Sequence, residues 1–550
     1  MTRAAAWATA LSFLSPSARR SGPNALEISA MTATAPRSRL HSSTAAARAH
    51  ELWSRVPPAL RLPLVVYLSC QACYLLWWMA FYPGLIDYDA LAYTWQVTTD
   101  HWISNHSVLY NSLLWLSLNS TGGFAALTLL QTVAMSAVLG YTCASLCTLG
   151  VRGRWSAPAA VACAAAPPLG VFTVYVGKDV PFTICAVLAF AVTVRLVGRR
   201  LQGRWNGHLR RSELLLLCVA FLGIGLFRNN GFPVAVIAAL SLLLVLPGAR
   251  RVIAVLVTVT TAVTLTLMLV VYSAVGIQKP PKALVYNLHY ADLAVTYAQA
   301  PGLFTQDDLR LMARAAPLSD WRTTGATCFA SDPLYRKLKG HVTDQLNESL
   351  VQLWWRTLRK APQKVMGARI CRGHIAWAVF PGPQDQGGRT YNSLNWVNPV
   401  FYKWYPEMRT SPYRQAAQPQ PPSQALHDVG VFAYAASRVP QLEWLLWRGA
   451  IWCYATYVLV TRLARARGCR PLFALAGVTF GNQLTVFVAT PSPCFRYMAA
   501  PMFIGVLCLS LIPALRGAGR PVVPPPASRA TPSTTAATSP TSPKNVEYIP

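Results

Sequence analysis

Charged residues are scarce in this 550-residue chain, and acidic residues are the scarcest of them. Only 12% of the residues are Asp, Glu, Lys or Arg, with 19 acidic and 49 basic side chains, whereas a soluble domain carries roughly 25% charged residues. This shortage excludes an ordinary soluble globular protein. With 53% hydrophobic residues and a mean hydropathy of +0.33, the composition predicts an all-α polytopic membrane protein.

Continuous runs of more than two basic residues are also missing, although the formal net charge is +30. The positive charges are dispersed between apolar runs, so we expect no nucleic-acid partner. The 13 cysteines lie mostly inside apolar runs, where cysteine is a small packing residue. Cys70 and Cys73 have the C-x-x-C spacing, but they fall within such a run, so we expect neither a redox nor a zinc site there.

Ten apolar stretches approach the ~20 residues that a helix needs to cross a bilayer. They lie near residues 62–81, 123–149, 156–176, 180–198, 213–228, 232–248, 252–275, 444–462, 471–489 and 497–515. Residues 107–119 can add a shorter re-entrant or interfacial helix. The predicted domains are a disordered cytoplasmic N-terminus (1–55), a transmembrane region (56–275) with a first outer loop (82–107), an extracytoplasmic domain (276–443), C-terminal transmembrane helices (444–515) and a disordered cytoplasmic tail (516–550).

Arginine gathers in one set of the loops that connect the apolar stretches, with Glu213 as the single acid among them. These residues are Arg152, Arg154, Arg195, Arg199, Arg200, Arg204, Arg210, Arg211, Arg250, Arg251, Arg462, Arg465, Arg467 and Arg470. The other set of short loops holds only Lys178, Arg228 and Arg496. The positive-inside rule therefore predicts a multi-pass protein of the cell membrane with both termini in the cytoplasm.

The extracytoplasmic domain is predicted to be mainly helical. Thr305 is placed to cap a helix, one long helical pattern runs from Asp332 through residues 346–362, and Pro362 opens a third helix. Residues 381–424 are rich in Gly, Pro, Asn and Gln, which predicts irregular loop. From the sequence alone, ordinary packing or anchoring at the membrane surface is expected for six tryptophans of this domain: Trp321, Trp354, Trp355, Trp377, Trp396 and Trp404.

Two cysteines, Cys328 and Cys371, lie in this domain. An oxidising outer face permits a disulfide between them, and two free thiols are the alternative.

The loop from Phe81 to Asn111 carries acids and histidines but no Lys or Arg, which is anomalous in so basic a chain. Asp87 and Asp89 form a D-x-D pattern. Two carboxylates at this spacing can share a divalent cation, Mg²⁺ or Mn²⁺, or one can act as a base while the other orients it. The alternatives are solvated loop acids or a helix N-cap. His106 closes the same loop and can hydrogen-bond a phosphate or a sugar hydroxyl, or pack at a helix entrance.

Three further polar clusters fall on the same predicted outer face. Lys178 and Asp179 lie in a tight connection between two apolar stretches, Arg228 and Asn229 lie in another, and Arg496 precedes Tyr497 before the last stretch. The arginines can bind phosphate through two parallel hydrogen bonds. Each cluster taken alone can be an interfacial anchor. Several clusters on one face, from different stretches, favour a shared site.

These motifs, taken in order, resemble those of a known family. They are Phe81-Tyr82-Pro83-Gly84 followed by Asp89, Asn105-His106, Gly177-Lys178-Asp179-Val180-Pro181, Arg228-Asn229-Asn230-Gly231 and Phe495-Arg496-Tyr497. The set resembles a bacterial family of multi-spanning proteins related to the GT-C glycosyltransferases, over roughly residues 60–515. In that superfamily an acidic residue of the first outer loop is catalytic or binds metal, and this role falls on Asp89 and, with a weaker match, on Asp87. Ser107 departs from the family pattern, which usually has Pro after the histidine.

The resemblance implies a GT-C-type glycosyltransferase. It would move a sugar from a polyprenyl-phosphate donor to a glycan or glycolipid acceptor of the cell envelope, in contact with membrane lipids. Asp89, Asp87 and His106 would be catalytic; the substrate-binding residues would be Lys178, Asp179, Arg228, Asn229, Arg496 and Tyr497. The six tryptophans of the extracytoplasmic domain would be platforms on which sugar rings stack. A transporter or flippase of lipid-linked saccharides and a non-catalytic envelope scaffold are the alternatives. The sugar, the acceptor, the need for metal and the oligomeric state stay open.

Overall fold

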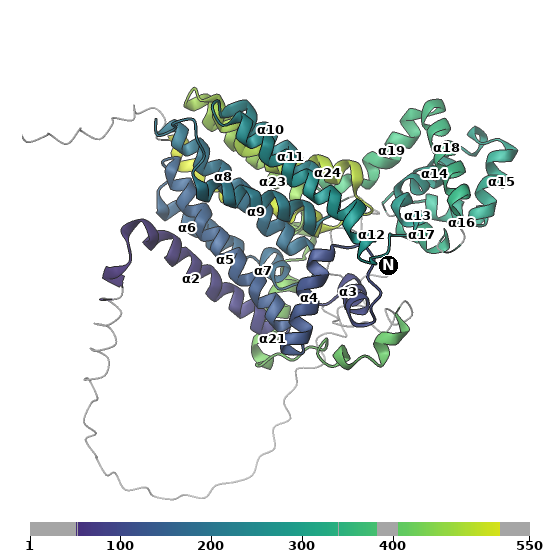
Figure 1. The fold of residues 1–550 in the computed structure, drawn as a ribbon, viewed down its shortest axis with the longest axis horizontal. Helices are drawn as coiled ribbons and strands as arrows, with labels where there is room; N and C mark the ends of the chain where they lie inside the picture. The colour runs from purple at the N-terminus through teal and green to yellow at the C-terminus, as the bar shows by residue number, and fades with distance from the viewer. Residues whose placement is uncertain are drawn as a thin grey trace, which may run out of the picture. The chain divides into compact units, whose positions relative to one another are not determined.

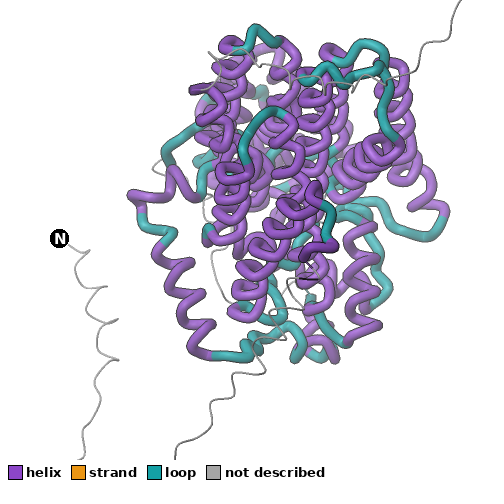
Figure 2. Tube along the Cα trace, turned by 90° about the vertical axis from the view of Figure 1, so that its left-hand side faces the viewer, coloured by secondary structure: helices purple, strands orange, loops and turns teal. Residues whose placement is uncertain are grey.

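The computed structural model describes residues 51–516, except for residues 52, 330, 339, 341 and 382–404. Within this part every regular element is a helix, which confirms the all-α class (Figure 1, Figure 2). The predicted disordered ends lie almost entirely outside the described residues, and so do Trp396 and Trp404. The chain separates into residues 1–57 and 58–550, and all elements named below belong to the second unit.

Helices occupy all ten predicted apolar stretches. The first region contains α2 (Pro58–Ala80), α3 (Tyr88–Thr98), α4 (Val108–Thr121), α5 (Ala125–Thr148), α6 (Gly153–Ala165), α7 (Pro167–Thr173), α8 (Asp179–Leu201), α9 (Arg211–Phe227), α10 (Phe232–Val245), α11 (Arg250–Thr266) and, after the π-helical turn Leu267–Val271, α12 (Tyr272–Ala274). The last region contains α23 (Gly449–Ala466), the 3₁₀ segment Arg470–Ala476, α24 (Gly477–Ala489), the 3₁₀ turn Phe495–Met498, α25 (Ala499–Cys508), the 3₁₀ turn Leu509–Leu511 and α26 (Ile512–Arg516).

Six helical segments are long and apolar enough to cross a membrane, as expected of a helical membrane protein. They are Pro58–Ala80, Ala125–Thr148, Asp179–Leu201, Arg250–Ala274, Arg470–Ala489 and Phe495–Leu515. The pair α6 and α7, bent by 68°, makes a seventh if it is one span. The helices at the other predicted spans, α9, α10 and α23, have 17, 14 and 18 residues, so a total of ten spans remains a prediction.

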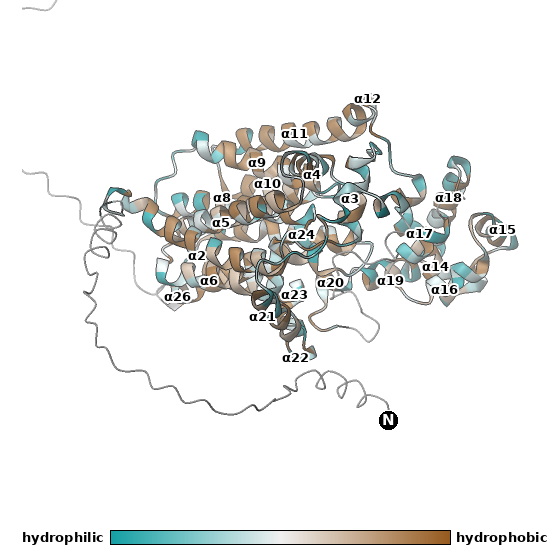
Figure 3. Ribbon diagram, turned by 90° about the horizontal axis from the view of Figure 1, so that it is seen from below, coloured by the Kyte–Doolittle hydropathy of each residue, from teal (hydrophilic) through white to brown (hydrophobic). Residues whose placement is uncertain are grey.

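Helix α8 is enclosed by the other helices of the bundle, because almost every one of its side chains is buried. It packs against α5, α9 and α25. Outer helices such as α11 instead expose Val255, Val259 and Val263, and Figure 3 shows hydrophobic residues along their length. Exposed apolar side chains on long helices suit a hydrocarbon surrounding rather than water. The beginning of α8 carries Asp179, and its other end carries Arg199, so this helix links two polar poles.

The segment between the two regions is helical, as predicted. It contains α13 (Lys282–Val285), α14 (Asn287–Gln299), the 3₁₀ turn Pro301–Leu303, α15 (Gln306–Ala315), α16 (Leu318–Gly325), α17 (Asp332–Leu338), α18 (Asp344–Lys360), α19 (Pro362–Arg372), α20 (His374–Trp377), the 3₁₀ turns Pro406–Arg409 and Pro412–Arg414, α21 (Gln424–Ala436) and α22 (Pro440–Leu446). In Figure 3, α15 and α18 carry more hydrophilic residues than the bundle helices.

The segment contains a helix cap and a disulfide at positions that the sequence indicated. Thr305 caps α15 through a reciprocal pair of hydrogen bonds with Asp308, as its position predicted. Cys328 and Cys371 form a disulfide that links the chain after α16 to α19. The alternative of two free thiols is therefore not observed, and a disulfide is typical of an oxidising compartment.

The tryptophans of this segment divide into buried and exposed ones. Trp321 is fully buried and donates a hydrogen bond to the Met312 carbonyl oxygen, and Trp354 is also buried, so both pack in the core of the segment. Trp355 and Trp377 are half exposed.

Candidate functional site

The loop after α2 lies against the connection that precedes α8. The backbone N–H of Leu85 donates to the Val174 carbonyl oxygen (3.0 Å), and the N–H of Val176 donates to the Leu85 carbonyl oxygen (2.9 Å). Gly84 permits this approach: its φ is +137°, and a Cβ there would lie 2.5 Å from Thr128 Cγ2. The pairing places the D-x-D loop beside the first turn of α8.

Arg496 lies at the centre of the site, with its side chain only 14% exposed. Its Nη2 is 2.6 Å from Asp89 Oδ2, its Nη1 is 3.4 Å from Asp87 Oδ2, and its Nε is 3.4 Å from Asp179 Oδ2. Nη1 also donates a hydrogen bond to the Tyr175 hydroxyl oxygen at 3.0 Å. One guanidinium therefore forms ion pairs with three carboxylates, which come from two separate segments of the chain.

Arg228 is a second arginine that contacts Asp179. Its Nε is 3.8 Å from Asp179 Oδ1, and its guanidinium lies over the rings of Tyr497 (4.5 Å) and Phe182 (5.3 Å). Such cation–π contacts fix the orientation of a buried arginine. Arg228 is almost fully buried. The Asp179 carboxylate therefore lies between two guanidinium groups, those of Arg228 and Arg496.

Lys178 and His106 form a second pair in the site. Lys178 Nζ donates to His106 Nδ1 at 3.1 Å; an ammonium can only donate, so the imidazole is neutral with its proton on Nε2. Burial, together with the nearby Lys178 charge, lowers the pKa of His106 to about 3. Burial likewise lowers the pKa of Lys178. The charge of Lys178 also acts on Asp89, so the two groups of residues form one electrostatic site.

The loop that carries His106 is held by backbone contacts. Asn229 Nδ2 donates to the carbonyl oxygens of Ser104 (2.9 Å) and Asn105 (3.4 Å), so Asn229, predicted as a substrate-binding residue, positions this loop. Ser107 caps α4 by accepting from the Tyr110 N–H at 3.1 Å. Ser107 therefore has a structural role as the N-cap of α4.

The two acids of the D-x-D pattern differ in environment. Asp87 is the N-cap of α3, accepting from the Ala90 N–H at 3.1 Å, so the capping alternative is confirmed for this residue. Burial and the neighbouring Asp89 carboxylate raise the pKa of Asp87 to about 6. Burial also opposes ionisation of Asp89, but the adjacent Arg496 charge outweighs it and lowers the pKa of Asp89 to about 2.

The donor set does not fit a resident divalent cation. Among the described residues, no group of three or more His, Cys, Asp or Glu side chains is placed to hold a metal ion. Asp87 and Asp89 both form ion pairs with the Arg496 guanidinium, whose positive charge takes the place that a cation would occupy.

Tyr405, in the segment after α20, packs against aromatic residues of α3 and completes one wall of the site. The hydroxyl groups of Tyr88 and Tyr405 are 3.4 Å apart, and the Trp95 ring lies 5.1 Å from the Tyr405 ring. The N–H of Ser331, just before α17, donates to the Pro491 carbonyl oxygen at 3.0 Å, and this bond ties the helical segment to the loop that precedes Arg496.

The structure brings together Asp87, Asp89, His106, Lys178, Asp179, Arg228, Arg496 and Tyr497, all predicted site residues. The sequence reasoning missed Tyr175, Phe182 and Tyr405. The position of Tyr175, three residues before Lys178, was an available signal for one of them. No family model, no curated protein and no solved structure matches this chain.

Proposed function

We propose that this chain is an integral-membrane glycosyltransferase of the GT-C type, which transfers a sugar from a polyprenyl-phosphate donor to a cell-envelope acceptor. The observation that supports the proposal is the cluster itself. It combines carboxylates that can accept a proton with Arg496 and Lys178, which can neutralise a departing phosphate. It also lies at the beginnings of two apolar spans, Asp179–Leu201 and Phe495–Leu515, where a lipid phosphate group would be.

In the proposed reaction the acceptor hydroxyl oxygen attacks the anomeric carbon while the bond from that carbon to the phosphate oxygen breaks. The configuration at the carbon inverts, and polyprenyl phosphate leaves. Asp89 accepts the proton of the hydroxyl. Arg496 and Lys178 stabilise the charge on the leaving phosphate, and neutral His106 donates its Nε2 proton in a hydrogen bond to a phosphate or sugar oxygen.

The pairing of Asp89 with Arg496 suggests an order of binding. While paired, Asp89 is a weak base, because its pKa is about 2. A phosphate that binds Arg496 competes with the carboxylate for the same guanidinium and thereby makes Asp89 more basic. Donor binding would thus prepare the base before the acceptor reacts.

One observation favours a transporter or flippase of lipid-linked saccharides as the second candidate. Helices α6 and α7 are separated by a 68° bend, and discontinuous helices are common around transport sites. Against it, the charged cluster joins the ends of helices and does not follow a path along them. A transporter would move the lipid-linked donor without consuming it.

Asp89→Asn tests the enzyme directly, because it keeps the side-chain shape and removes the basicity. We expect transfer from a radiolabelled polyprenyl-phosphate sugar in purified protein to fall by roughly 100-fold to 10,000-fold, the range of general-base effects. Asp100→Asn is the matched control, since Asp100 is exposed in the same loop and its positive φ of 57° is tolerated by asparagine. Full transfer by Asp89→Asn would rule out the assignment and favour the transporter or the scaffold.

A further inference from the structure

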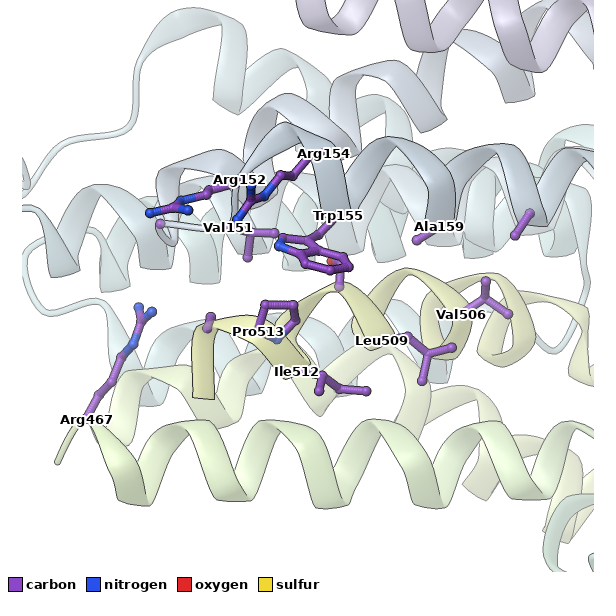
Figure 4. Close-up of a pocket in the computed structure, with 14 residues that line it drawn as sticks. Val151, Arg152, Arg154, Trp155, Ala159, Arg467, Val506, Leu509, Ile512 and Pro513 are labelled. Atoms are coloured by element: carbon purple, nitrogen blue, oxygen red, sulfur yellow. The ribbon is translucent and has the colours of Figure 1, made fainter. Parts of the chain in front are cut away.

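A groove lies far from the cluster around Arg496, at the other end of the last span, Phe495–Leu515. It has a volume of about 920 Å³ and is lined by residues of α6, α25 and α26, beside the place where α6 packs against α25 (Figure 4). Arg496 begins the span and Ile512 lines the groove, so the helical rise puts about 24 Å between them. The groove therefore belongs to the opposite pole from the proposed catalytic cluster.

The walls of the groove are apolar and partly open to the surroundings. Its apolar lining residues are Val151, Trp155, Ala159, Ala162, Val506, Leu509, Ile512, Pro513 and Ala514. The side chains of Trp155, Leu509 and Ile512 are 45%, 39% and 39% exposed. In Figure 4 the Trp155 ring lies between α6 and the C-terminal helices, with Val506 and Ala159 towards the other end.

Three arginines, Arg152, Arg154 and Arg467, give the groove a single sign of charge, and no lining residue is acidic. Arg467 Nη1 donates to the Leu149 carbonyl oxygen at 2.8 Å, which fixes this side chain, and Arg154 lies 5.6 Å from the Trp155 ring centre. Figure 4 shows the arginines at one end of the groove. This end of the groove therefore favours an occupant that is anionic there.

We propose that this groove binds one anionic phospholipid. Its phosphate would lie at Arg152, Arg154 and Arg467, because guanidinium groups bind phosphate oxygens through paired hydrogen bonds. Its acyl chain would lie along Val506 and Leu509, on the apolar wall of a membrane-spanning segment. Trp155 is the kind of residue that occupies the boundary between headgroups and hydrocarbon. This site does not depend on the proposed sugar transfer, since it shares no residue with it.

The test is a lipid titration of the purified full-length protein, with phosphatidylglycerol and phosphatidylcholine as probes and native mass spectrometry as the readout. We expect tighter binding of phosphatidylglycerol at one site. Replacing the three groove arginines with Gln should weaken that binding roughly tenfold to a hundredfold, while leaving phosphatidylcholine binding unchanged. The control is the triple variant Arg204→Gln, Arg211→Gln and Arg251→Gln, which removes the same charge from exposed positions elsewhere.

Two further variants keep the test decisive. Arg152→Gln with Arg154→Gln leaves the Arg467 hydrogen bond intact, so it separates lipid binding from folding. Ala159→Phe keeps every charge but places a ring in the groove, and it should also abolish the tight site. Equal loss in the control triple variant, binding unaffected by Ala159→Phe, or competition by free inorganic phosphate as strong as by lipid would each overturn the proposal.

Discussion

Arg496 determines the charge balance of the proposed active site, because three carboxylates depend on it. Arg496→Ala leaves Asp87, Asp89 and Asp179 without their shared partner, and breaking a buried ion pair in this way costs about 3–5 kcal/mol. We therefore expect this variant to accumulate poorly in the membrane. Arg496 thus serves both stability and the proposed chemistry.

Lys178→Ala tests the proposed chemistry separately from stability. The variant removes the hydrogen-bond donor of His106, and the imidazole left behind is neutral. We expect normal membrane levels and a loss of turnover of roughly tenfold to a hundredfold, since a charge-assisted bond to phosphate contributes on the order of 1.5–3 kcal/mol. Immunoblots of membrane fractions with a transfer assay measure both quantities. Disappearance of the protein from the membrane would instead indicate a structural lysine.

Asp87 provides a pH test with a defined sign. Its pKa is raised from 3.8 to about 6 in the folded protein, by burial and by Asp89, so the folded state keeps a proton that the unfolded state has already lost. Stability from this group is complete below pH 3.8 and is lost as the pH rises through 6. Asp87→Asn cannot ionise, and asparagine still caps α3. The melting temperature of the native protein, relative to that of Asp87→Asn, should therefore fall between pH 4 and pH 7.

Asp100→Asn again serves as the control, and its melting temperature should follow that of the native protein across the same range. A constant difference between the native protein and Asp87→Asn at all pH values would contradict the raised pKa.

At the scale of elements, the sequence predicted helices where caps and apolar runs are strong. The Thr305 cap and the ten apolar stretches are examples. The prediction of one long helix from Asp332 is wrong, because the segment forms two helices, α17 and α18. Gly340 between them has a φ of +85°, and Thr343 caps the second helix. The convergence of the polar loops depends on the contact between Leu85 and the segment before α8, which no local pattern encodes.

Gly84 tests that contact. Gly84→Ala combines a strained φ of +137° with a contact of 2.5 Å to Thr128, so it should displace the D-x-D loop and abolish most transfer activity. Gly122→Ala is the matched control: its φ is +72° but nothing lies within 4 Å, so it should cost only about 1–2 kcal/mol of backbone strain and leave the site in place. Equal activity of the two variants would show that the loop does not need this close approach.

At the scale of the whole molecule, polar residues concentrate at the two ends of the helices. Asp179 and Arg199 mark these ends on α8, and Glu213 neutralises the second through an ion pair of 2.5 Å. The distribution of arginine along the sequence indicates two poles, because loop charge responds to membrane orientation, and their orientation stays a prediction. The sequence could not predict which polar residues meet, since that depends on how the helices pack.

The pole that contains Arg496 should lie outside the cytoplasm, and the pole that contains Arg199 should lie inside it. A reporter enzyme that is active only outside the cytoplasm should be active when inserted after Thr305 and inactive when inserted after Gly203. Thr305 lies in the segment that contains the Cys328–Cys371 disulfide, which forms in an oxidising compartment. Gly203 lies in the connection between α8 and α9, which is rich in arginine. A reporter that replaces the tail after residue 516 should be inactive, like the one at Gly203. Activity at Gly203 would reverse the orientation and place the Arg496 cluster on the cytoplasmic face, where a donor with its phosphate on the outer leaflet could not reach it.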